Sequence, residues 1–286
     1  MSRTDLALEQ AGTLCDMEGI AMLERGKAFR ITEITIDSDE HGAKIGRGKG
    51  RYLTLEAEQL SHFSADYREQ TEELAAELRS FLPSGEILAV GLGNSDITPD
   101  ALGPATAAKI LATRHLRTEL AADNADTRFL RNLRPVSVLA NGVLGQTGIE
   151  TAELVTALRD TVHPQAIVAI DALACSDLHR LGTTIQISDA GISPGSGVQN
   201  SRKELSVRTL GIPVIAVGVP MVVDMHTIAA HYAGQTIAEQ QNTLPNMMVT
   251  PRDIDKLLSR ASDLLAAALN LALHPQLTFA DIEALA

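Results

Sequence analysis

The sequence predicts an α/β fold, a three-layer sandwich with a mostly parallel central sheet and a small β appendage near the N-terminus. Three short apolar runs, at 87–91, 136–139 and 166–171, are expected to be buried strands. Apolar residues at helical spacing follow the first two runs, at 100–116 and 150–160. Strands joined through helices are typical of parallel βαβ units, in which helices cover both faces of the sheet.

The appendage is expected at 28–56. Residues 29–36 alternate with period two and are rich in β-branched side chains, and residues 51–55 form a second strand. The loop between them is basic and is either a solvated hairpin or a guide for a substrate. Its basic residues are His41, Lys44, Arg47 and Lys49. Further strands are expected at 183–187 and 213–220, helices at 56–82 and 251–273, helix-compatible sequence within 1–25, and a linker at 234–250.

The composition is that of a soluble globular protein with one domain, 1–286. Of the 286 residues, 45% are hydrophobic and 21% are charged, enough for one large core. Aromatic residues make up 3% and the net charge is −12, which argues against direct binding to nucleic acid or to an anionic membrane. The two cysteines, Cys15 and Cys175, indicate a reducing compartment. No signal peptide or membrane-spanning run is present, so a cytoplasmic location is expected.

Two aspartates lie at the expected carboxyl edge of the parallel sheet. Asp100 follows the glycine turn after the first strand, and Asp171 ends the third strand. Because parallel strands end at one edge of a sheet, the two carboxyl groups are expected to meet. Repulsion and burial then raise one pKa, which leaves an acid and a base to activate water and protonate a leaving amine. The plainer alternatives are that Asp100 is a helix N-cap and that Asp171 caps a turn.

Other chemistries are less well supported by the sequence. The turn begins like a dinucleotide fingerprint, but its last glycine position is Asp96, so no nucleotide is expected. Cys175 and His179 would share one face if their segment were helical, although a local, non-catalytic cysteine is the commoner case. Zinc-ligand spacing is absent, and neither a metal nor another cofactor is expected. A metal held by Asp100, Asp171 and a histidine stays open as an alternative.

Many short motifs resemble the germination protease family of spore-forming bacteria, which degrades small acid-soluble spore proteins. They occur in the family's order and run nearly from end to end. Among them are Arg3–Ala7 (Arg-Thr-Asp-Leu-Ala), Gly91–Asn94 (Gly-Leu-Gly-Asn), Thr98–Pro104 (Thr-Pro-Asp-Ala-Leu-Gly-Pro), Ala169–Ala174 (Ala-Ile-Asp-Ala-Leu-Ala) and Thr183–Asp189 (Thr-Thr-Ile-Gln-Ile-Ser-Asp).

The resemblance implies an atypical aspartic endopeptidase whose fold is similar to that of hydrogenase-maturation proteases. Its two essential aspartates correspond to Asp100 and Asp171, the pair already selected from the sheet edge. The matching motifs make Asn94, Asp96 and Thr98 candidate neighbours of the site. Asp96 stands where the family has Asn, and its charge would shift the pKa of the pair. Which aspartate is the acid stays open.

The resemblance also implies a zymogen, a homotetramer and a location in the spore core. The pro-segment is removed by a cut after the aspartate of the Arg-Thr-Asp-Leu-Ala motif, between Asp5 and Leu6, which leaves residues 1–5 as a short pro-segment. The expected substrates are small acid-soluble spore proteins, cut after an acidic residue that precedes an apolar one. The alternatives are a metal-assisted peptidase using the same carboxylates, or a non-catalytic protein that binds spore proteins.

Overall fold

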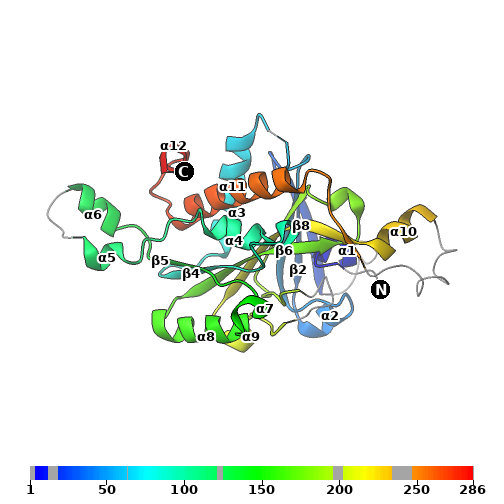
Figure 1. Cartoon of the computed structure of the whole chain (residues 1–286), viewed down its shortest axis with the longest axis horizontal. Coiled ribbons are helices and arrows are strands. Elements are labelled where there is room, and N and C mark those ends of the chain that lie inside the picture. Colours follow the sequence, from blue (N-terminus) through cyan, green and yellow to red (C-terminus); the bar gives the residue numbers. More distant parts are fainter. Residues whose placement is uncertain are drawn as a thin grey trace.

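A computed structural model describes residues 4–11, 19–62, 64–120, 125–195, 202–233 and 247–285. Within these ranges the chain forms a nine-stranded sheet in the order β1-β2-β3-β7-β8-β6-β4-β5, with β9 paired to β8 (Figure 1). The strands are β1 (Ile20–Arg25), β2 (Arg30–Ile36), β3 (Gly50–Glu56), β4 (Ile87–Gly91), β5 (Val136–Ala140), β6 (Ala166–Cys175), β7 (Thr184–Ser188), β8 (Val214–Asp224) and β9 (Met248–Val249).

Helices connect the strands and flank the sheet. They are α1 (Ala7–Ala11), α2 (Asp39–Ala43), α3 (Tyr67–Phe81), η1 (Thr98–Asp100), α4 (Leu102–Ala107), α5 (Leu116–Glu119), α6 (Ala125–Arg131), α7 (Leu144–Thr147), α8 (Thr151–Val162), η2 (Leu178–Arg180), α9 (Val207–Leu210), α10 (Met225–Ala233), α11 (Ile254–Leu273) and α12 (Phe279–Leu285). No helix in the described ranges has both the length and the apolar content to cross a membrane.

The sheet is mixed, with a parallel part and an antiparallel part. Strands β5, β4, β6 and β8 run parallel, as the three apolar runs predicted. Strand β7 runs antiparallel to both β8 and β3, and β3 continues through β2 to β1. The predicted α/β class is confirmed, and the strands of the expected β appendage belong to the same sheet because β7 joins them to it.

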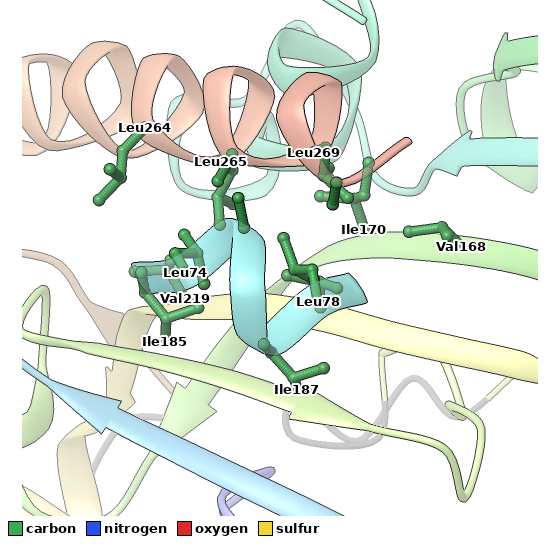
Figure 2. Packing of buried hydrophobic residues seen from close by; sticks show 14 of the residues in the cluster. Leu74, Leu78, Val168, Ile170, Ile185, Ile187, Val219, Leu264, Leu265 and Leu269 are labelled. Carbon is green, nitrogen blue, oxygen red and sulfur yellow. The ribbon is translucent and has the colours of Figure 1, made fainter. Parts of the chain in front are cut away.

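The main core lies between one face of the sheet and helices α3, α4 and α11. Figure 2 shows Leu74 and Leu78 of α3 between the sheet and α11, which contributes Leu264, Leu265 and Leu269. Each fully buried side chain of this size stabilises the fold by about 1.5–3 kcal/mol. The apolar cluster fills most of this face, and at its margin Glu33 of β2 forms ion pairs with Arg25 and Arg51.

The opposite face is covered by three smaller apolar clusters. Val155 of α8 and Leu210 of α9 pack on the parallel strands, together with Ile167 and Ala169 of β6. The chain's own residues 6–8 provide further cover, with Leu6 and Ala7 fully buried and Leu8 nearly so. Leu6 packs on the carboxyl ends of β6 and β8, and Ala7 and Leu8 pack on β2 and β3. This second face also carries Asp171, because side chains alternate along β6 and Asp171 shares the parity of Ile167 and Ala169.

Several predicted boundaries are wrong for identifiable reasons. The helix expected at 100–116 ends at Ala107, because buried Asn270 of α11 accepts the N–H of Leu111 at 2.9 Å and donates to the carbonyl of Lys109 at 3.0 Å. The helix expected at 56–82 begins at Tyr67, since Ala57 and Leu60 bond to the chain just before β7 instead.

The N-terminal region also differs from expectation. Residues 20–25 form strand β1 in the stretch taken as helix-compatible, paired along its length with β2. Cys15 lies outside the described residues, as do residues 1–3 and most of the linker expected at 234–250.

Candidate active site

Asp171 lies within β6 and not at its end, which corrects the expectation from the sequence. Strand β6 continues to Cys175, whereas the neighbouring β4 ends at Gly91, opposite Ile170. Asp171 is therefore the first residue of β6 beyond the end of β4. The side chain is 6% exposed, and its Oδ1 accepts the N–H of Ala172 at 3.0 Å. Asp171 therefore lies at the edge of the sheet where β4 ends and the glycine turn toward Asp100 begins.

Asp100 is held by the turn that follows β4. It ends the 3₁₀ turn η1, and its Oδ2 accepts the N–H of Asn94 at 2.8 Å. It does not cap the following helix, because α4 begins at Leu102 with Ala101 at the N-cap position. The N-cap alternative for Asp100 is therefore wrong, and its carboxylate instead closes the glycine turn onto η1.

Close backbone contacts bring this turn against β6. A Cβ on Gly103 would lie 2.4 Å from the carbonyl oxygen of Ile170, so only glycine lets α4 approach the strand beside Asp171. Gly93 has φ +110°, and a Cβ there would lie 2.0 Å from the carbonyl oxygen of Asp100. These two glycines carry Asp100 to the neighbourhood of Asp171.

Both carboxyl groups have raised pKa values, and the charge of Asp100 contributes to the shift of Asp171. Burial raises the pKa of Asp171 well above its usual range, and the nearby charges of Asp100 and Asp5 raise it further. Burial also raises the pKa of Asp100, but the hydrogen bond from the Asn94 N–H opposes this by stabilising the carboxylate. The pKa of Asp171 is raised more strongly than that of Asp100, so Asp171 holds a proton more readily than Asp100 does, a difference of the kind that paired acid–base chemistry uses.

The three predicted neighbours, Asn94, Asp96 and Thr98, lie in the segment between the end of β4 and the start of η1. The side-chain oxygen of Asn94 accepts the N–H of Asp96 at 2.9 Å, and Gln146 donates to both Asn94 at 2.7 Å and Asp96 at 3.0 Å. Thr98 begins η1, and its carbonyl accepts the N–H of Ala101. Only Asn94 bonds directly to the aspartate pair, while exposed Asp96 is joined to it through Asn94 and Gln146.

A cavity of about 270 Å³ opens beside Asp171. Its walls come from the loop after α2, from strands β3, β6, β7 and β8, and from the segment after β7; Asp100 does not line it. Asp5 of the chain's own N-terminal segment lines the same cavity, so this segment lies within the candidate site.

The N-terminal segment is held along its backbone. Asp5 donates its N–H to the carbonyl of Ala174 at 2.9 Å, and its carboxylate accepts the N–H of Ala174 at 2.8 Å. Leu6 is fully buried among Leu173, Cys175 and Val223. The predicted cleavage site between Asp5 and Leu6 therefore lies beside Asp171, with the acidic side chain on the backbone of β6 and the apolar one in a pocket.

Two further residues contact this segment and were not predicted as site residues. Gln186 of β7 donates to the carbonyl of Asp5 at 2.9 Å and accepts the N–H of Ala7 at 2.7 Å. Arg47 donates to the carbonyl of Thr4 at 3.1 Å, and burial lowers its pKa. The sequence offered two signals for these residues. Gln186 is the one amide in the short strand β7, and Arg47 lies in the basic loop that was expected to be either a solvated hairpin or a guide for a substrate.

The thiol alternative fails on geometry. Cys175 lies in β6 and not in a helix, so its spacing to His179 does not place the two on one face. Burial raises the pKa of the thiol to about 12, which keeps it uncharged near neutral pH. Among the described residues, no cluster of three or more His, Cys, Asp or Glu side chains has an arrangement suited to a metal ion.

Comparisons with known proteins agree with the motifs. A family model described as germination protease matches residues 3–239. The germination protease of Caldanaerobacter subterraneus subsp. tengcongensis is 39% identical, covering 96% of this chain and 95% of its own length. That of Clostridium tetani is 36% identical with 98% of both chains covered, and that of Bacillus velezensis is 37% identical with 96% and 94% covered.

Among solved structures, a NiFe hydrogenase maturation protease from Thermococcus kodakarensis is similar over 68% of this chain and 98% of its own, with a TM-score of 0.36 and 16% identity. The predicted family resemblance is confirmed by the sequence comparisons, which extend over nearly the whole chain. The chain therefore belongs to the germination protease family and is a peptidase.

Proposed function

We propose that this peptidase is an endopeptidase that initiates degradation of small acid-soluble spore proteins during germination, with Asp100 and Asp171 as its catalytic pair. The observation that carries the proposal is buried Asp171, whose pKa is raised by burial and by Asp100, beside a cavity whose wall includes Asp5 of the chain's own N-terminal segment. Such a pair hydrolyses an amide without a nucleophilic side chain.

In this mechanism the two carboxyl groups have different roles. Asp100, whose carboxylate is stabilised by the Asn94 N–H, takes a proton from water as the hydroxide oxygen bonds to the carbonyl carbon. Asp171, kept protonated by its surroundings, gives its proton to the leaving nitrogen as the C–N bond breaks. The products are a carboxylic acid and an amine, and exchange with solvent returns a proton from Asp100 to Asp171.

The N-terminal segment supports the proposed preference for an acidic residue followed by an apolar one. Asp5 offers its carboxylate to a backbone N–H of β6, and Leu6 fills an apolar pocket. We propose that Asp5–Leu6 is the bond whose cleavage converts a zymogen to the active form. We further propose, from the family resemblance, that the enzyme acts in the spore core as a homotetramer, which light scattering would test.

The experiment that tests the function is cleavage of a purified small acid-soluble spore protein. Products would be mapped by mass spectrometry in parallel samples with and without EDTA. The chain would be compared with Asp100→Asn, Asp171→Asn and the exposed control Asp255→Asn on α11. We expect cuts after acidic residues that persist in EDTA, and loss of at least about 10²-fold in rate for either site variant alone.

The other outcomes separate the alternatives. Activity abolished by EDTA and restored by a divalent metal would replace the proposal with metal-assisted hydrolysis by the same carboxylates. Near-normal activity in a folded Asp100→Asn or Asp171→Asn variant would exclude the paired mechanism. No cuts from a chain already trimmed to Leu6 would favour a non-catalytic protein that binds spore proteins.

A further inference from the structure

Asp171 and Gln186 face each other across one strand of the sheet. In the pairing register, Asp171 of β6 lies opposite Gly218 of β8, and Gly218 lies opposite Gln186 of β7. Residues in one register row point to the same face of a sheet, and the strands on either side of β8 are separated by about 10 Å. Gly218 has no side chain, and a Cβ there would lie 2.7 Å from the side chain of Leu173. Asp171, Gly218 and Gln186 all line the cavity described above.

The backbone of the N-terminal segment is held within this space by both ends of the Gln186 side chain. Its Nε2 donates to the carbonyl oxygen of Asp5 at 2.9 Å, and its Oε1 accepts the N–H of Ala7 at 2.7 Å. The first hydrogen bond is to the carbonyl of the Asp5–Leu6 peptide bond itself, and the second is to the N–H of the next peptide unit, Leu6–Ala7. The side chain is only 8% exposed, and both functional atoms of its amide bond the peptide backbone.

We propose that Gln186 is a catalytic residue that stabilises the oxyanion formed on the carbonyl of the bond being cut, an inference that rests on the proposed function of the site. Its Nε2 contacts the carbonyl of Asp5, whose carboxylate is close enough to Asp171 to raise the pKa of that residue. The amide nitrogen is a donor near the place where negative charge develops.

The chemistry of the step is consistent with this role. When the oxygen of water bonds to the carbonyl carbon, the carbonyl π electrons move to oxygen, and the Gln186 N–H bond to that oxygen strengthens. When the C–N bond breaks, the C=O bond re-forms and the proton from Asp171 goes to the leaving nitrogen. Gln186 neither gains nor loses a proton, and a positioned donor of this kind contributes about 10²- to 10³-fold to kcat.

The second hydrogen bond predicts a limit on substrates. The residue two positions after the cut must provide a backbone N–H to Gln186, as Ala7 does in the chain's own segment. Proline has no N–H, so peptides with proline at this position are expected to be poor substrates. Ala7 is the first residue of α1, a position where proline is tolerated in helices, and Ala7→Pro removes the N–H that bonds Gln186.

Two measurements test the proposal. The first is steady-state cleavage of a small acid-soluble spore protein by the chain and by Gln186→Met, with the exposed Gln276→Met as matched control. The second is hydrogen exchange of the Ala7 amide in the uncleaved Asp100→Asn chain, with and without Gln186→Met. We expect Gln186→Met to lower kcat by about 10²- to 10³-fold with a smaller change in KM, and to speed exchange at Ala7 by at least about 10-fold. Ala7→Pro should slow the cut at Asp5–Leu6.

The outcomes distinguish this inference from the proposed function. If the wild-type chain cleaves and folded Gln186→Met keeps kcat within about threefold, the catalytic role is overturned while the proposed function stands. If the wild-type chain does not cleave, the proposed function fails and the catalytic role fails with it. In that case the exchange rate still tests whether Gln186 accepts the N–H of Ala7. Unchanged protection of the Ala7 amide in Gln186→Met would show that this hydrogen bond is not made.

Discussion

Replacing Asp171 with Asn should make the protein more stable near neutral pH while removing its activity. Asn has almost the shape of a protonated aspartic acid, so the packing around this buried position is retained. It differs in that it never ionises. The folded protein penalises the ionised form of Asp171 by burial and by the charges of Asp100 and Asp5, and the variant is free of this penalty.

The sign and the size of the effect follow from the raised pKa. Between the pKa of Asp171 in the unfolded chain and its higher pKa in the folded chain, the folded state binds more protons. The free energy of unfolding therefore falls as pH rises through this window, by up to about 1.4 kcal/mol per pH unit. This stability is fully present below the unfolded-state pKa and lost above the folded-state pKa. Asp171→Asn lacks this slope, so its advantage grows with pH.

Urea unfolding measured from about pH 4.5 to 8 provides the assay. The wild-type chain, Asp171→Asn and the exposed control Asp255→Asn would be compared, after intact mass has shown that all three have the same N-terminus. The control should follow the wild-type pH dependence. Parallel curves for wild type and Asp171→Asn across this range would refute the reasoning, because they would mean that Asp171 ionises as easily in the folded protein as in the unfolded chain.

Two further substitutions test other parts of the structure. Asn270→Ala removes the hydrogen-bond partner of the Leu111 N–H and of the Lys109 carbonyl, just after the end of α4. The free energy of unfolding should therefore fall by about 2–3 kcal/mol. A fall of less than about 0.5 kcal/mol would contradict the role of Asn270 in ending this helix. Cys175→Ala should keep cleavage activity close to wild type, because burial keeps the thiol protonated. Lost packing should lower the free energy of unfolding by about 1–2 kcal/mol. Loss of activity in a folded variant would mean that the thiol takes part in the mechanism.

The elements that run straight through the core were predictable from local patterns. The apolar runs of β4, β5 and the first half of β6 identify strands, and the glycine turn after β4 is visible in the sequence. Strands β4 and β6 are buried as expected, whereas β5 is only partly buried because it lies at the edge of the sheet. The end of β6 was misjudged because a single carboxylate at Asp171 interrupts an apolar run that continues through Cys175. A buried acidic residue inside a strand resembles the end of the strand when the sequence is inspected only up to that residue. The apolar residues 172–175 that follow Asp171 are the signal that the strand continues.

Interactions across the sequence account for the other boundary errors. The helix after η1 was expected to continue because its residues favour helix, yet Asn270 from α11 takes the backbone groups at its end. Strand β1 was missed because its outer edge is largely exposed and its pairing with β2 depends on a partner that local periodicity does not reveal. In each case, hydrogen bonding to a residue that is distant in the sequence determines the secondary structure, and local propensity does not.

By itself, the sequence determined the α/β class, the parallel strands and the placement of Asp100 and Asp171 at one edge of the sheet, because strand order along the chain brings the ends of parallel strands to one edge. Only the tertiary structure decided what surrounds Asp171. The antiparallel insertion of β7 beside β8 places Gln186 in its register row, and the loop after α2 brings Arg47 to the segment held there. These neighbours come from separate parts of the chain, and only the order and register of the strands bring them together.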